Sequence, residues 1–154
     1  METYVFVVNM KGKQMFCVSI IPPEKAMKDG LKGEVVVGFL KEKGGLRPEN
    51  FVANKPFKDF MHEVIGKEIL KDPFCKEEAK RVKDGSIFII DARTPDLQGN
   101  VPPYDIIGVV KVAKGKVVKG SYERNPNHSL VSPTGMFKLS EYLEKKLIKA
   151  LSKL

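Results

Sequence analysis

Two proline-containing segments carry most of the side chains that could bind a ligand or move a proton. They span residues 91–105 and 124–138, and neither shows helical or strand periodicity over its length. Loops longer than about 12–15 residues are uncommon in compact domains and are usually functional or disordered. Five of the ten prolines lie in these two segments, which favours loops of fixed shape.

A predicted hairpin brings the two segments together. Residues 106–123 contain two runs of β-branched residues around Lys114-Gly115, where glycine supplies the positive φ that a two-residue turn requires. With that turn, Asp105 faces Arg124 across the open end of the hairpin. One segment enters the hairpin at this end and the other leaves it there. The sequence therefore predicts a single mouth between them.

The mouth combines side chains that suit a small polar ligand. Carboxylates, guanidinium groups, amides, phenols and an imidazole would converge beside a buried strand. We expect a binding or interaction domain for a small polar or anionic ligand at the mouth formed by loops 91–105 and 124–138. The predicted ligand-binding residues are Arg93, Asp96, Tyr104, Asp105, Tyr122, Arg124, Asn125, Asn127 and His128.

Two other interpretations fit the same residues. In a hydrolase-type enzyme, Asp91 and His128 would be the candidate catalytic acid–base groups. In a structural network, Asp105 and Arg124 would only close the hairpin, and Asp91 would cap backbone N–H groups of its own loop. Asn125-Pro126-Asn127 is also good turn chemistry.

Metal, cofactor and thiol chemistry find little support in the sequence. There is no phosphate loop, dinucleotide-binding glycine pattern or paired-cysteine zinc site, so we expect neither a metal nor a cofactor. His62 lies on a predicted helix, but glycine occupies the position four residues later, where a second ligand would stand. Cys17 and Cys75 lie on a predicted strand and a predicted apolar helix face, which indicates buried, reduced thiols.

The positive charge is concentrated near the end of the chain. The formal net charge is +8, and residues 111–154 hold 10 basic and 3 acidic side chains, which accounts for +7 of it. A third hypothesis is therefore a nucleic-acid-binding protein. It would use Lys111, Lys114, Lys116 and Lys119 on the hairpin, together with the lysines of the last helix.

A compositional interpretation competes with nucleic-acid binding. Lys outnumbers Arg 23 to 4, and glutamine and cysteine occur twice each, a pattern typical of thermophile proteins. Arginine is the preferred residue for bidentate phosphate or guanine recognition, and it is scarce here. Nucleic acid therefore remains possible as a partner but is not favoured.

The elements that position these residues predict an α+β fold. Apolar spacing and caps indicate a short helix over 24–29 and longer helices over 54–70, 72–84 and 140–154. Two apolar faces predict interior strands at the N-terminus, and the apolar run Ile87 to Ile90 predicts a central one. We expect an antiparallel-rich mixed sheet of about six strands, covered by about three helices. The strands are 3–9, 14–21, 34–41, 86–90, 106–112 and 116–123.

Length and composition place the whole chain in one class. Its 154 residues, 42% of them hydrophobic and 30% charged, predict a single globular domain over residues 1–154. No apolar run reaches the roughly 18 residues of a membrane helix, and no secretory signal is apparent. We therefore expect a cytoplasmic protein with no membrane partner; the oligomeric state is left open.

Overall fold

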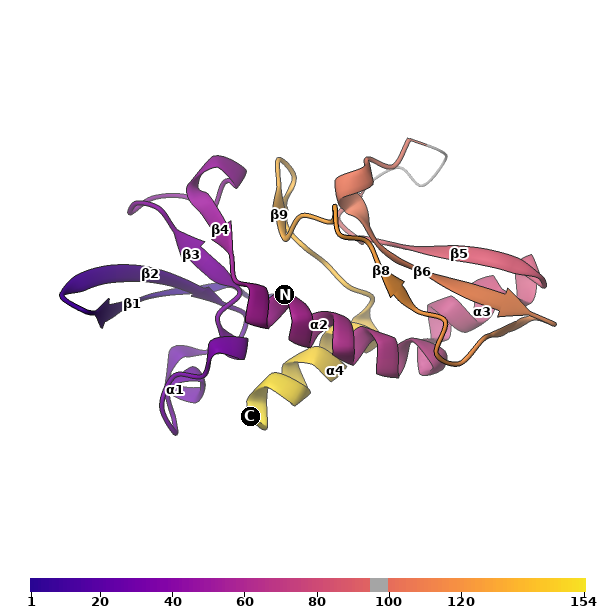
Figure 1. Cartoon of the computed structure of the whole chain (residues 1–154), viewed down its shortest axis with the longest axis horizontal. Helices are drawn as coiled ribbons and strands as arrows, with labels where there is room; N and C mark the ends of the chain where they lie inside the picture. The colour runs from indigo at the N-terminus through magenta and orange to yellow at the C-terminus, as the bar shows by residue number, and fades with distance from the viewer. Residues whose placement is uncertain (95–99) are drawn as a thin grey trace.

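The computed structural model describes residues 1–94 and 100–154. It has mixed helix and strand content with antiparallel sheets, which confirms the predicted α+β class. The strands form three sheets, of four, four and two strands, so the expectation of one six-stranded sheet is wrong. Figure 1 shows one four-stranded sheet at either end of the molecule, with helices between them.

The N-terminal sheet has the strand order β1-β2-β3-β4. A two-residue turn joins β1 and β2, and Lys11 and Gly12 both have positive φ there, 51° and 79°, which suits the right-handed twist of a hairpin. The predicted strand 34–41 is reduced to three residues, because its first part forms a 3₁₀ helix. The elements are β1 (Tyr4–Met10), β2 (Lys13–Ser19), α1 (Pro23–Ala26), η1 (Gly33–Val35), β3 (Gly38–Leu40), η2 (Pro48–Asn50) and β4 (Phe51–Ala53).

β1 is an edge strand rather than the interior strand that its two apolar faces predicted. Phe6 and Val8 pack against the core, as expected. Val5 and Val7 face away from it and are 52% and 48% exposed. Alternation of side chains along a strand allows one apolar face to remain uncovered.

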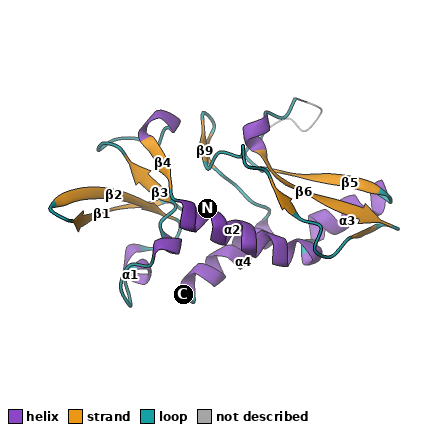
Figure 2. Cartoon of the chain, viewed as in Figure 1, coloured by secondary structure: helices purple, strands orange, loops and turns teal. Residues whose placement is uncertain are grey.

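Helices connect the two large sheets. α2 (Lys55–Glu68) crosses the middle of the molecule, α4 (Glu141–Ser152) lies alongside it, and α3 (Pro73–Val82) follows the short η3 (Ile69–Lys71) (Figure 2). Most residues of the apolar stripes of α2 and α4 are buried in one cluster, which also takes in residues of both four-stranded sheets. Its large helical members are Phe57, Met61, Ile65, Leu143, Leu147 and Leu151.

The second four-stranded sheet lies beside α3. Its elements are β5 (Gly85–Ile90), η4 (Pro103–Asp105), β6 (Ile106–Ala113), β7 (Lys116–Val117) and β8 (Glu123–Arg124), and a separate hairpin follows as β9 (Val131–Ser132) and β10 (Gly135–Met136). β5 pairs only with β6 and is therefore an edge strand, not the predicted central one. Its apolar run reflects packing of Ile87 into the core on one side, while Phe88 is 60% exposed on the other.

The hairpin register differs from the sequence prediction beyond its turn. Ala113 pairs with Lys116 around the expected two-residue turn. A second turn then follows, in which Ser121 N donates to Val118 O at 3.2 Å. It takes up three extra residues, so that Arg124 pairs with Gly108 instead of facing Asp105. The second predicted strand is consequently split into β7 and β8.

In the part of the chain that the structure describes, no helix combines the length and apolar character needed to cross a lipid bilayer.

Candidate functional site

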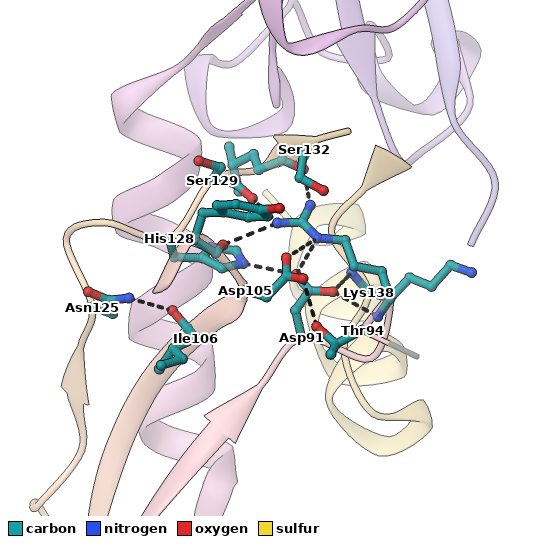
Figure 3. A network of polar contacts seen from close by, with 12 residues as sticks. Asp91, Thr94, Asp105, Ile106, Asn125, His128, Ser129, Ser132 and Lys138 are labelled. Carbon is teal, nitrogen blue, oxygen red and sulfur yellow. Dashed lines mark hydrogen bonds and ion pairs between the residues drawn. The ribbon is translucent and has the colours of Figure 1, made fainter. Parts of the chain in front are cut away.

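Buried polar side chains gather where the two proline-containing segments meet (Figure 3). Asp91 directly follows β5, and Asp105 ends η4 just before β6. His128 comes from the segment after β8, and all three side chains have almost no exposed surface. The predicted convergence of the two segments is therefore present, although its centre lies inside the protein.

Arg93 is the hub of this buried polar cluster. Its Nε donates to Asp105 Oδ1 at 2.7 Å. Nη1 donates to the carbonyl oxygens of Leu130 and Gly135 at 3.2 and 2.9 Å. Nη2 donates to those of Tyr104, at 3.2 Å, and Ser129. A guanidinium has five N–H donors, and all five are used here, so Arg93 joins the two segments and has no donor left for a ligand.

Asp91 links the cluster to both segments. Its Oδ1 accepts hydrogen bonds from the backbone N–H groups of Arg93, at 3.1 Å, and Lys138, at 2.8 Å. Its Oδ2 lies 2.9 Å from His128 Nε2 and 3.5 Å from Arg93 Nε. The predicted capping role of Asp91 is thus present, and the imidazole is an additional partner.

Asp105 is held by neighbours from its own segment. Its Oδ2 accepts a hydrogen bond from the Thr94 hydroxyl at 2.7 Å, and its backbone carbonyl accepts one from Asp91 N at 2.7 Å. Among the described residues, the hydrogen bonds of this carboxylate are therefore all made with side chains of its own segment.

The imidazole of His128 has one unused polar atom. Because a carboxylate only accepts hydrogen bonds, the contact with Asp91 assigns the proton to Nε2. Nδ1 is buried and has no hydrogen-bond partner among the described residues. Unpaired buried nitrogen atoms are uncommon, and they occur at sites of strain, catalysis or bound water.

Arg124 does not bind Asp105, because the three-residue shift moves it to the surface. It contacts Asp59 on α2 at 2.7 Å, and both side chains are more than two-fifths exposed. Lys55 contacts the same carboxylate at 2.7 Å. These two cations, Lys55 first and Arg124 second, lower the pKa of Asp59 to about 2.

Tyr122 forms a second buried polar contact, with His62 of α2. The phenol oxygen lies 2.7 Å from Nδ1, and the two rings are stacked. Burial lowers the pKa of His62 to about 4, with a smaller effect from the charge of Arg124. Burial also raises the pKa of Tyr122. A neutral imidazole accepting from the phenol hydroxyl follows from both shifts.

Two glycines make room for the Tyr122 ring. A Cβ atom added to Gly66 would lie 3.3 Å from the ring, and one added to Gly108 would lie 2.6 Å from it. Gly66 lies within α2, which continues to Glu68, and provides space on the surface of the helix. In the sequence, the only indication of the contact between Tyr122 and α2 is that glycine occupies position 66 inside the helical pattern.

The other predicted ligand-binding residues have structural contacts or lie outside the cluster. Asn125 donates through Nδ2 to the carbonyls of Pro103 and Ile106, and it accepts from Asn127 N in the expected turn. Tyr104 contributes its backbone carbonyl to the cluster. Asp96 lies outside the described residues.

A hollow of about 380 Å³ lies on the outer side of the 124–138 segment. It separates the end of the N-terminal sheet from residues 126–131, and it contains one cationic side chain, Lys58 of α2. The sequence prediction missed Lys58 and Phe51, because nothing in the sequence indicates that β4 lies opposite this segment. The lining residues are Pro48, Phe51, Ala53, Lys58, Pro126, Asn127, His128, Ser129, Leu130 and Val131.

The lysines proposed for nucleic acid divide between two places. Lys111, Lys114, Lys116 and Lys119 are exposed around the β6–β7 turn. Figure 1 shows the β6–β7 turn at one end of the molecule and the C-terminal end of α4 nearer to its middle. The hairpin lysines and the lysines of α4 thus belong to separate elements, and nucleic-acid binding stays an untested hypothesis.

The two cysteines are buried and free, as predicted. Among the described residues, no group of three or more histidine, cysteine or acidic side chains is arranged to hold a metal ion. Comparisons of the chain with family models, curated proteins and solved structures find no match.

Proposed function

We propose that the protein binds a small organic anion with an apolar body in the hollow between β4 and residues 126–131. The observation that carries this proposal is the composition of the hollow, whose lining combines apolar residues with a single cation. Pro48, Phe51 and Pro126 provide apolar contact, and Lys58 provides the charge. Ligand sites usually combine a mainly apolar lining with a few polar groups that fix orientation.

The surroundings of Lys58 strengthen the attraction for an anion. Lys55 and Arg124 share the single carboxylate of Asp59. Lys58 is the neighbour of Asp59 on α2, and the charges of Arg124 and Lys58 both lower the pKa of His62, one turn further along the helix. Three cations and one carboxylate leave a local positive excess, which attracts anionic ligands.

The buried polar cluster would keep one wall of the hollow in place. Ser129 and Leu130 line the hollow, and their carbonyl oxygens are bound by Arg93. Holding a wall in its binding conformation before the ligand arrives reduces the entropy lost on binding. In this proposal the cluster acts as support, and Lys58 makes the charged contact.

A hydrolase that uses Asp91 and His128 is the second candidate. One observation favours it: Asp91 orients the imidazole through Nε2 and leaves Nδ1 without a partner, an arrangement that suits a general base. The imidazole has no exposed surface, however, so a substrate reaches it only after the covering residues move. Binding in the hollow requires no such movement.

The binding proposal can be tested with benzoate and phenyl phosphate as anionic probes and benzyl alcohol as a neutral one. Backbone amide NMR shifts should change for residues 51–53 and 127–131 with the anions, and binding of benzyl alcohol should be weaker. Lys58→Gln should weaken anion binding by about tenfold or more, since a charge-assisted hydrogen bond contributes roughly 1.5–3 kcal/mol. Lys67→Gln, at an exposed position of the same helix, is the matched control.

Three results would count against the binding proposal: no shift at residues 127–131, equal affinity for the neutral probe, or equal loss in both lysine variants. For the second candidate, 4-nitrophenyl phosphate or 4-nitrophenyl acetate would be turned over by the wild type and not by a folded His128→Gln variant. Absence of turnover in the wild type with both esters would remove that candidate.

A further inference from the structure

The outer edge of β1 is open. β1 pairs with β2 along one side, through seven regular residue pairs from Tyr4–Ser19 to Met10–Lys13. In the described part of the chain, no other strand pairs with it, and no loop forms a backbone hydrogen bond to it. The other side of β1 is therefore a row of free backbone donors and acceptors.

The hairpin turn determines which residues carry these free groups. A two-residue turn makes its flanking residues, Met10 and Lys13, a hydrogen-bonded pair. Hydrogen-bonded and non-hydrogen-bonded pairs alternate along an antiparallel ladder. The N–H and C=O groups of Val5, Val7 and Asn9 consequently point outward. Two of these three residues also have half-exposed apolar side chains.

β1 lacks the features that usually prevent edge-to-edge pairing. Proteins protect edges with proline, lysine, bulges or very short strands. Between Thr3 and Met10 there is no proline and no charged residue, and the register has no irregularity. β5, the edge of the other large sheet, differs because it carries a register shift between Ile89 and Ile90.

Opposite charges lie at the two ends of β1. The carboxylates of Glu2 and Glu24 raise the pKa of Tyr4, through the hydrogen bond that the Tyr4 hydroxyl donates to Glu2 first and the charge of Glu24 last. Lys11 and Lys13 lie at the turn, at the other end of the strand. The base of β1 is thus acidic and its tip is basic.

We propose that β1 pairs antiparallel with β1 of a second copy of this chain. Antiparallel pairing places the basic tip of each copy at the acidic base of the other, so the same attraction occurs twice around a two-fold axis. A parallel arrangement would bring like charges together. This self-complementarity is the reason for choosing a second copy as the occupant.

The outward groups also limit the register of the pair. Only Val5, Val7 and Asn9 can exchange hydrogen bonds with the second copy. Odd-numbered residues of one β1 must therefore lie opposite odd-numbered residues of the other. One such register places Val5 opposite Val7 of the partner subunit and centres the axis on Phe6. The exposed valines of both copies then lie on one face of an eight-stranded sheet and cover one another.

Sedimentation velocity over a range of protein concentrations tests the proposal. The wild type should form a dimer with a Kd below about 1 mM. Val7→Lys should weaken it at least tenfold, because a lysine on an edge strand resists pairing. Val118→Lys is the matched control, since Val118 is also partly exposed and lies outside β1; it should leave the dimer unchanged.

A charge exchange gives an independent measurement. One variant combines Lys11→Glu with Lys13→Glu, and the other combines Glu2→Lys with Glu24→Lys. Each should dimerise at least tenfold more weakly alone, and their mixture should form a heterodimer. Circular dichroism establishes that each variant is folded. A wild-type monomer at all concentrations, a dimer that Val7→Lys does not weaken, or a mixture without heterodimer would overturn the proposal.

Discussion

Replacing Arg93 with lysine tests whether the buried polar cluster stabilises the fold. The substitution keeps the positive charge between Asp91 and Asp105 and removes the planar group with five donors. A lysine ammonium has three donors, so at least two of the five acceptors now bound by Arg93, which are Asp105 Oδ1 and four carbonyl oxygens, lose that hydrogen bond.

The magnitude follows from the number of hydrogen bonds lost, because the carbonyls of Tyr104 and Leu130 keep backbone donors. A hydrogen bond to a charged group contributes about 1.5–3 kcal/mol, so the loss of two reduces the free energy of unfolding by about 3–6 kcal/mol. This is a large part of the roughly 5–15 kcal/mol that stabilises a domain. At about 2–4 °C per kcal/mol for a chain of this size, Tm should fall by roughly 6–24 °C.

Calorimetry of Arg93→Lys beside Arg124→Lys separates this effect from a general effect of replacing arginine. Arg124 makes one exposed ion pair, which contributes at most about 1 kcal/mol. Its replacement should change Tm by no more than about 4 °C. If both variants have the same Tm, the hydrogen bonds of Arg93 do not stabilise the fold, and the cluster cannot be the support that we propose for the hollow.

Three further predictions concern ionisable groups. The pKa of His62 falls from 6.5 to about 4 on folding, so its contribution to the free energy of unfolding should be fully present above pH 6.5 and decrease towards pH 4, by at most about 1.4 kcal/mol per pH unit. Urea titrations at several pH values measure this for the wild type and His62→Gln. The same dependence of unfolding free energy on pH in both proteins would contradict the prediction. Because Lys55 and Arg124 lower the pKa of Asp59 from 3.8 to about 2, its stabilising contribution should be present above pH 3.8 and be lost towards pH 2. In Arg124→Gln, NMR should show that pKa shifted back towards 3.8, and an unchanged value would exclude the contact. Burial raises the pKa of Cys75 to about 11, so a thiol reagent at pH 8 should modify it only after unfolding, and rapid native labelling would refute this.

Helices were predictable because their signals are local. Apolar spacing indicated residues 54–70, 72–84 and 140–154, with proline near the start of the first two, and the structure has α2, α3 and α4 within those ranges. The first hairpin was also predictable, since a Lys-Gly pair between apolar runs favours a two-residue turn.

Strand partners were not predictable in the same way. An apolar run indicates a strand but not its neighbours, so β1 and β5 were assigned to the interior when both are edges. The three-residue β4 is too short to give a pattern. The split of one predicted strand depends on the turn near Gly120, whose positive φ a glycine permits but does not require.

The candidate site was partly predictable for a related reason. Loop length and hairpin connectivity placed Asp91, Arg93, Asp105 and His128 near one another, and the structure brings them into contact. Whether a polar side chain faces a ligand or a carbonyl depends on which backbone groups lack partners. The sequence does not show those groups, so the internal use of all five Arg93 donors was not foreseen.

The Tyr122 ring between Gly66 and Gly108 has an evolutionary consequence. The two glycines lie on α2 and β6, and each leaves space for the same side chain. The two positions differ in what else limits them, because a Cβ atom at Gly108 would also lie 2.6 Å from the backbone oxygen of Glu123. A lineage that replaces Tyr122 with a smaller residue therefore releases Gly66 but not Gly108. In a library selected for folding, alanine at position 66 should be enriched in clones that have lost the tyrosine, and glycine should be kept at position 108 in all clones.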